Sequence, residues 1–83
     1  MKEETRLEIQ KGLDWLSRER GDSAATTAAY MHFFSASKME KIAKPLLFMS
    51  RIDIAMANMK GAKKILLKSV SLPQSPENKR WNV

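Results

Sequence analysis

One apolar pattern between Pro45 and Val70 constrains this chain more than any other feature of its sequence. Six apolar residues there follow one another at alternating spacings of four and three, which is typical of a helix face and not of a strand. On an ideal helix they fall within a sector of about 80°. We predict that this face is a helix-pairing seam and an oligomer interface. The seam consists of Phe48, Ile52, Ala55, Met59, Ala62 and Leu66.

Two further helices are predicted before this segment, at residues 2–20 and 23–43. The first has an apolar stripe at helical spacing. Gly12 within it indicates a close contact with another helix, because glycine costs about 1 kcal/mol there relative to alanine. The second helix begins after a suitable N-cap at Asp22 or Ser23, and its alanine-rich seam is the predicted partner of the later helix. The sequence therefore predicts an all-α fold of three helices, at about residues 2–20, 23–43 and 45–70.

Pro45 decides how the second and third helices are joined. Proline lacks a backbone N–H and disfavours helical geometry at the preceding residue, so a break is predicted at Lys44. The apolar faces on the two sides of Pro45 are also out of phase. We therefore favour two helices with a tight connection, and keep one long helix kinked at Pro45 as the alternative.

The end of the chain differs in composition from the rest. Residues 71–83 contain two prolines and several polar side chains, so we expect a flexible, extended tail after a single helical domain of residues 1–70. Within the tail, Lys79, Arg80 and Trp81 form a candidate docking motif for a partner, because aromatic and arginine side chains are favoured at interfaces. The alternative is that Trp81 folds back onto the apolar surface of the helices.

The third helix is apolar well beyond its seam, with isoleucine, leucine and methionine on both flanks. Such a helix needs neighbours on more than one side. A chain of 83 residues without cysteine has few other sources of stability, so we expect a homodimer with twofold symmetry. The chain also has six methionines, which make apolar faces adaptable and suit a surface that binds a partner protein.

The excess positive charge lies entirely after the first helix. Residues 1–20 hold five basic and five acidic side chains, whereas residues 21–83 hold ten basic and four acidic ones and carry the whole net charge of +6. Flexible ammonium groups clustered in this way suit contacts with nucleic-acid phosphates. The candidate anion-binding residues are Lys60, Lys63, Lys64, Lys68, Lys38, Lys41 and Lys44.

Recognition of a specific nucleic-acid sequence is not expected. The chain has no zinc-finger spacing, and arginine, the usual reader of guanine, is scarce in its basic part. Tyr30, Phe33 and Phe34 precede Lys38 and are either core residues or a platform on which single-stranded bases stack.

The sequence predicts neither a catalytic nor a metal site. His32 is the only histidine, no cysteine is present, and no carboxylate lies within one helical turn of His32. Asp53 and Glu40 stand alone in basic segments, where we expect them to pair with neighbouring basic side chains. No phosphate-binding glycine loop or nucleophile motif is present. We therefore expect no enzymatic activity and no cofactor.

Two functions are consistent with these features. In the first, the protein is a small basic accessory protein that binds nucleic acid with weak or no sequence specificity. In the second, it is a regulator or inhibitor that docks on an acidic partner protein through an apolar helix face and the Trp81 tail. Binding to a membrane surface is a third alternative. No signal peptide and no apolar segment of membrane-spanning length is found, so we expect a soluble, cytoplasmic protein.

Overall fold

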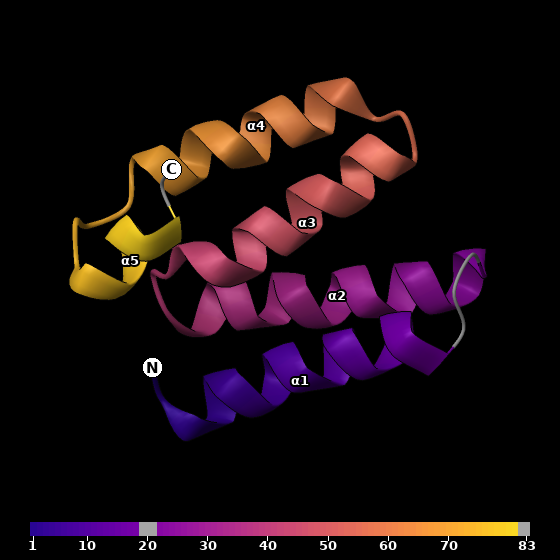
Figure 1. Ribbon diagram of the computed structural model, residues 1–83, viewed down its shortest axis with the longest axis horizontal. Coiled ribbons are helices and arrows are strands. Elements are labelled where there is room, and N and C mark those ends of the chain that lie inside the picture. The colour runs from indigo at the N-terminus through magenta and orange to yellow at the C-terminus, as the bar shows by residue number, and fades with distance from the viewer. Residues whose placement is uncertain (19–21, 82–83) are drawn as a thin grey trace.

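The described part of the chain folds into five helices, and most of them pack on the helix that precedes them in the chain (Figure 1). The computed structural model describes residues 1–18 and 22–81. Within these ranges there is no strand, and the predicted all-α class is confirmed. The helices are α1 (Glu3–Arg18), α2 (Ser23–Met39), α3 (Ala43–Ala55), α4 (Met59–Val70) and α5 (Pro76–Trp81).

α2 lies between α1 and α3 and contributes the centre of the core (Figure 1). Phe33 is completely buried there, together with the alanines on the same side of the helix. The predicted close contact at Gly12 is confirmed, because a Cβ atom at this position would lie 2.6 Å from a ring carbon of Phe33. The buried core residues are Ile9, Ala29, Phe33, Ala36, Ile42, Leu46, Met49 and Ile52.

The single helix predicted over residues 45–70 is wrong, because the chain turns back at residues 56–58 between α3 and α4. Ala57 has a φ of 60° in this turn, and the next residue, Asn58, is the N-cap of α4. The Asn58 side chain accepts a hydrogen bond from the N–H of Gly61 at 3.1 Å. The backbone N–H of Asn58 donates to the backbone carbonyl of Asp53 at 2.7 Å. These local hydrogen bonds end one helix and begin the next despite the uninterrupted apolar spacing.

The predicted seam is therefore divided between two antiparallel helices (Figure 1). Ile52 on α3 and Ala62 on α4 are buried, and Phe48 is partly buried against the core. Met59 and Leu66 on α4 are 59% and 39% exposed. Ala55, at the end of α3, is exposed as well.

The favoured prediction of two separate helices around Pro45 is confirmed, but the break between them lies at a different position. The break lies at residues 40–42 and not at Lys44, and Pro45 is buried within the first turn of α3, where its missing N–H costs nothing. Ile42 occupies the N-cap position of α3 and has no side chain that can cap the helix. Instead, the side-chain oxygen of Asn78 in α5 accepts a hydrogen bond from the N–H of Ala43 at 2.9 Å.

The extended conformation predicted for the end of the chain is wrong for residues 76–81, which form α5 and pack on α3. Asn78 is 1% exposed and also donates hydrogen bonds to the carbonyls of Lys41 and Pro73, at 3.1 and 2.8 Å. The domain boundary predicted at residue 70 stays a prediction. The predicted end of the first helix, at residue 20, lies outside the described residues; α1 is described up to Arg18.

Candidate functional site

α2 and α4 both pack on α3, and an open groove runs between them. Two adjoining hollows of about 500 and 250 Å³ make up this α2–α4 groove, and both are lined by Ser37, Leu46 and Lys68. Its floor consists of apolar side chains of α3 and the α4 residue Ile65. A groove that α2 and α4 share exists only because the chain reverses between α3 and α4.

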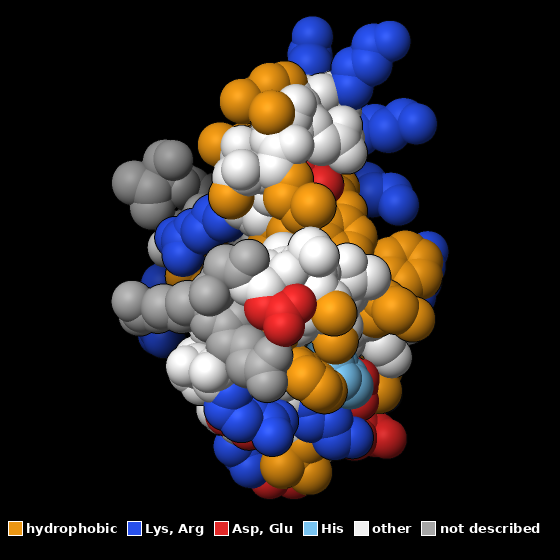
Figure 2. Space-filling model, turned by 90° about the vertical axis from the view of Figure 1, so that its right-hand side faces the viewer, with side chains coloured by type: hydrophobic (Ala, Val, Ile, Leu, Met, Phe, Trp, Pro, Cys, Tyr) orange, Lys and Arg blue, Asp and Glu red, His pale blue; other side chains and the backbone are white. Residues whose placement is uncertain are grey.

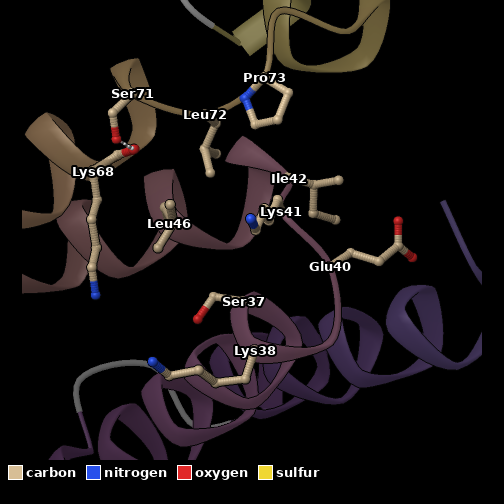
Figure 3. Close-up of a pocket in the computed structure, with 10 residues that line it drawn as sticks. All are labelled: Ser37, Lys38, Glu40, Lys41, Ile42, Leu46, Lys68, Ser71, Leu72 and Pro73. Carbon is tan, nitrogen blue, oxygen red and sulfur yellow. Dashed lines mark hydrogen bonds between the residues drawn. The ribbon is translucent and has the colours of Figure 1, made fainter.

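Four of the seven candidate lysines converge on the α2–α4 groove. Lys38 lines it from the end of α2, Lys41 from the connection that follows, and Lys64 and Lys68 from α4. The side chains of Lys38 and Lys68 extend from opposite helices toward the same side of the larger hollow (Figure 3). The spacing of lysines in the sequence indicated two clusters, and the fold brings two lysines of each cluster to the same groove.

The groove lysines are not neutralised by carboxylates within the described residues. Glu40 is the one acidic residue among those lining the larger hollow, and it extends away from Lys38 and Lys68 (Figure 3). Its carboxylate accepts a hydrogen bond from the backbone N–H of Lys2 at 2.5 Å. The Thr5 side chain and this N–H lower the pKa of Glu40, so it stays ionised at neutral pH but is directed elsewhere. The predicted pairing of Glu40 with a neighbouring basic side chain is wrong.

The remaining three candidate lysines lie apart from the groove. Lys60 and Lys63 are exposed on α4, and Lys63 borders an apolar hollow on the outer side of that helix. Figure 2 shows basic side chains extending from one side of the upper part of the molecule, where α4 lies, and hydrophobic ones gathered on the other. The ammonium group of Lys44 lies 5.7 Å from the ring centroid of Trp81, on the side where α5 packs.

The three aromatic residues of α2 have different environments. Phe33 is a core residue, and Tyr30 is half-buried with its hydroxyl donating to Asp53 at 3.2 Å. Phe34 is 47% exposed on the groove side, and the ammonium group of Lys38 lies 5.1 Å from its ring centroid. An exposed aromatic ring beside lysines is the combination that binds single-stranded bases. Of the three, Phe34 is the remaining candidate for stacking on single-stranded bases.

The candidate docking motif at the end of the chain is held against α3. The Trp81 ring packs edge-on against Phe48 at 6.2 Å between centroids, so this tryptophan folds back as the alternative reading predicted. Lys79 and Arg80 are exposed. Their part in docking stays a prediction.

A second surface that carries no core contact is the outer face of α4. It forms a shallow apolar hollow bordered by Lys63, and its large side chains are between 39% and 60% exposed. This α4 outer face consists of Met59, Leu66, Leu67 and Val70, together with Ile54 from the adjoining end of α3. Two members of the predicted oligomer seam, Met59 and Leu66, belong to it.

The carboxylates and the histidine have partners that the sequence did not indicate. His32 Nδ1 lies 2.6 Å from Glu8 Oε2 on α1, and this contact lowers the pKa of Glu8. Asp53 is buried and accepts hydrogen bonds from Tyr30 and from the Asn58 side chain, not from a basic residue. Burial and the nearby Asp53 carboxylate raise the pKa of Tyr30. An acidic partner that lies on the neighbouring helix, more than 20 residues away in the chain, leaves no signal in the local sequence.

Two further properties bear on function. Among residues 1–18 and 22–81, no three histidine, cysteine, aspartate or glutamate side chains gather in a way that could hold a metal ion. No helix of that part of the chain is long and apolar enough to cross a membrane. The chain matches no protein-family model, no curated protein and no solved structure.

Proposed function

We propose that the protein binds nucleic acid with weak or no sequence specificity, through the α2–α4 groove, and catalyses no reaction. The observation that carries this proposal is the convergence of Lys38, Lys41, Lys64 and Lys68 on one groove without a carboxylate partner among the described residues. Uncompensated ammonium groups create a local positive potential, and phosphate contacts by lysine need no fixed geometry. Lys60 and Lys63 extend the basic surface along α4.

A titration of fluorescently labelled oligonucleotides of mixed sequence, followed by anisotropy across a salt series, tests this proposal. For four or five phosphate contacts, the logarithm of the association constant falls with the logarithm of salt concentration at a slope of about −4. We expect Lys64→Gln/Lys68→Gln to reduce the magnitude of that slope by about two and to weaken binding about tenfold or more at low salt. Binding that ignores salt, or no binding at low salt, contradicts the proposal.

A matched control removes the same charge elsewhere. Arg6 and Lys11 are exposed on α1, at the opposite edge of the molecule from α4 (Figure 1). Arg6→Gln/Lys11→Gln lowers the net charge by the same amount as the groove variant, so it should leave the slope almost unchanged. Equal losses in both variants would indicate attraction to the overall charge and no defined site.

The exposed ring of Phe34 favours single strands over duplex, because bases can stack on it only when they are unpaired. Removing one stacking contact costs about 1–3 kcal/mol, which is a loss of about five- to 150-fold in affinity. We expect Phe34→Ala to show this loss for single-stranded oligonucleotides and no loss for duplexes of the same length. Equal effects on both would assign Phe34 a structural role only.

The second candidate function is docking on an acidic partner protein, and the α4 outer face is the observation that favours it. Exposed leucine, isoleucine, methionine and valine beside Lys63 match an amphipathic helix with an acidic border. Trp81 contributes to such docking only if α5 leaves α3, because its ring packs on Phe48.

Two surface variants distinguish the candidates in a pull-down from cell extract treated with nuclease. Leu67→Asn/Val70→Asn changes the α4 outer face, and Lys64→Gln/Lys68→Gln changes the groove. A protein partner retained by the groove variant and lost by the outer-face variant supports docking. Identical partners for wild type and the outer-face variant would remove this candidate.

A further inference from the structure

α4 is attached to the rest of the molecule through one neighbour. It packs on α3, and no other helix of residues 1–18 and 22–81 makes an extensive contact with it. It buries Ala62 and Ser69, and Ile65 is its contact with the hydrophobic core. A second copy of the chain has the same α3 surface, so α4 can make these contacts on its own chain or on that of a partner.

The turn that returns α4 to α3 is short and strained. Ala57 adopts a left-handed φ of 60°, a conformation that disfavours any residue with a Cβ atom and is normally left to glycine. Two methionines, Met56 and Met59, flank it and are 57% and 59% exposed. A short strained hinge beside uncovered apolar side chains favours exchange of the element that follows it.

The sequence through this turn is itself suited to a helix. Alanine and methionine are good helix formers, and the apolar spacing of α3 continues through residues 55–59 into α4 without interruption. Straightening the turn into a helix from Ala43 to Val70 removes the strain at Ala57. It loses the cap at Asn58 and the contacts of α4 with its own α3.

We propose that two copies of this chain exchange α4 together with α5, each opening at residues 56–58 into one continuous helix and placing both helices on the partner's α3. α5 must move with α4, because only residues 71–75 join the two. The exchanged α4 remakes the contacts of the closed form, and the two straightened hinges meet around the twofold axis. There they cover the methionines that the closed chain exposes. The interaction surface is the α3 face now occupied by α4, and the partner is a second copy.

This exchange makes the α2–α4 groove a composite of two chains. Lys38 and Lys41 would come from one copy, and Lys64 and Lys68 from the other. Each dimer then carries two such grooves on one rigid frame. The exchange itself does not depend on what the groove binds, so it can be tested separately from nucleic-acid binding.

Light scattering after size-exclusion chromatography, over a concentration series from about 1 μM to 1 mM, measures the dimer. We expect wild type to dimerise with concentration, and Ala57→Gly to raise the dissociation constant at least about 100-fold, because glycine relieves the closed turn and disfavours the open helix in both chains. Asn58→Ala, which removes the cap of α4 and improves the helix, should lower it.

Ala24→Gly is the matched control, since Ala24 is an exposed helical alanine on α2 and lies outside residues 56–58. It should leave the dissociation constant unchanged. A dimer that Ala57→Gly does not weaken would show association without exchange and would overturn the proposal. So would a monomer at every concentration for both wild type and Asn58→Ala.

A distance measurement tests the open helix directly. Spin labels on Lys44→Cys/Lys68→Cys start from a chain that has no other cysteine. In one continuous helix these positions are about 36 Å apart, at 1.5 Å per residue. Labelled chains mixed by unfolding and refolding with a tenfold excess of unlabelled ones report the distance within a chain. We expect a peak near that distance in the dimer fraction. A dimer fraction with only the short distance of the closed hairpin overturns the exchange.

Discussion

α2 and α4 are both held on α3, but to different extents. α2 is covered on two sides, buries the whole of Phe33 and brings three alanines into close contact with its neighbours. α4 is covered on one side, buries two small residues and leaves Leu67 and Val70 about 60% exposed. The comparison separates stability from binding: α1, α2 and α3 hold the fold, and α4 supplies surface that folding does not use.

The largest expected effect tests this separation by shortening one side chain on α2 and one on α4. Phe33→Ala removes a completely buried ring and should cost about 3–5 kcal/mol of unfolding free energy. Leu67→Ala, at an exposed position on α4, should change it by less than about 0.5 kcal/mol. Urea denaturation followed by circular dichroism measures both. Phe33→Leu keeps the comparison measurable if the alanine variant does not fold, and equal losses at the two positions would break it.

A pair of glycines sharpens the comparison, because each stands in a helix where alanine is intrinsically better by about 1 kcal/mol. At Gly12 the new methyl group would meet the Phe33 ring at 2.6 Å, and that ring is enclosed. We expect Gly12→Ala to lower the unfolding free energy by about 1–3 kcal/mol.

At Gly61 the nearest atom is the end of the Asn58 side chain, at 2.5 Å, which can rotate away. Gly61→Ala should therefore change stability by less than about 1 kcal/mol, since the better helix propensity offsets the disturbed cap. Thermal and urea unfolding compare the two variants. A stabilising Gly12→Ala would show that α1 and α2 are not in close contact.

The sequence was sufficient for the helical class, the close contact at Gly12 and the break before Pro45, because each depends on spacing or on one residue type. It was not sufficient for the turn at Ala57. Apolar spacing continues through that turn, and the residues that end α3 are a buried Asp53 and the cap Asn58. Their effect depends on Tyr30, which lies on another helix.

The candidate site was likewise predictable from the sequence only in part. Clustering of lysines was visible in the sequence, but their convergence from α2 and α4 depends on the direction of α4, which the missed turn sets. The pairing of Glu8 with His32 and the capping of α3 by Asn78 join residues far apart in the chain. Neither leaves a local pattern, so both required the packed structure.

The next effect concerns α5 at the end of the chain. Like α2, and unlike α4, this helix is expected to contribute to the stability of the fold. Asn78→Ala removes one acceptor and two donors that satisfy backbone groups at the start of α3 and before α5. We expect a loss of about 1–3 kcal/mol in unfolding free energy, because the hydrogen bond to the N–H of Ala43 is buried. Lys79→Ala, at the exposed neighbouring position, should cost less than about 0.5 kcal/mol. Equal, small effects would indicate that α5 is detached in solution.

The smallest effect lies between α1 and α2, where the hydrogen bond from His32 lowers the pKa of Glu8. A carboxyl with a lowered pKa in the folded state adds stability that is complete above its unfolded pKa of about 4.3 and is lost as pH falls through the folded value. We expect Glu8→Gln to cost about 1 kcal/mol at pH 7 and to flatten the loss of stability below about pH 4.3. The double variant with His32→Ala, in a mutant cycle of urea unfolding, should show coupling at pH 7 that disappears in acid. Absence of coupling at pH 7 would mean that the 2.6 Å contact contributes nothing to joining these two helices.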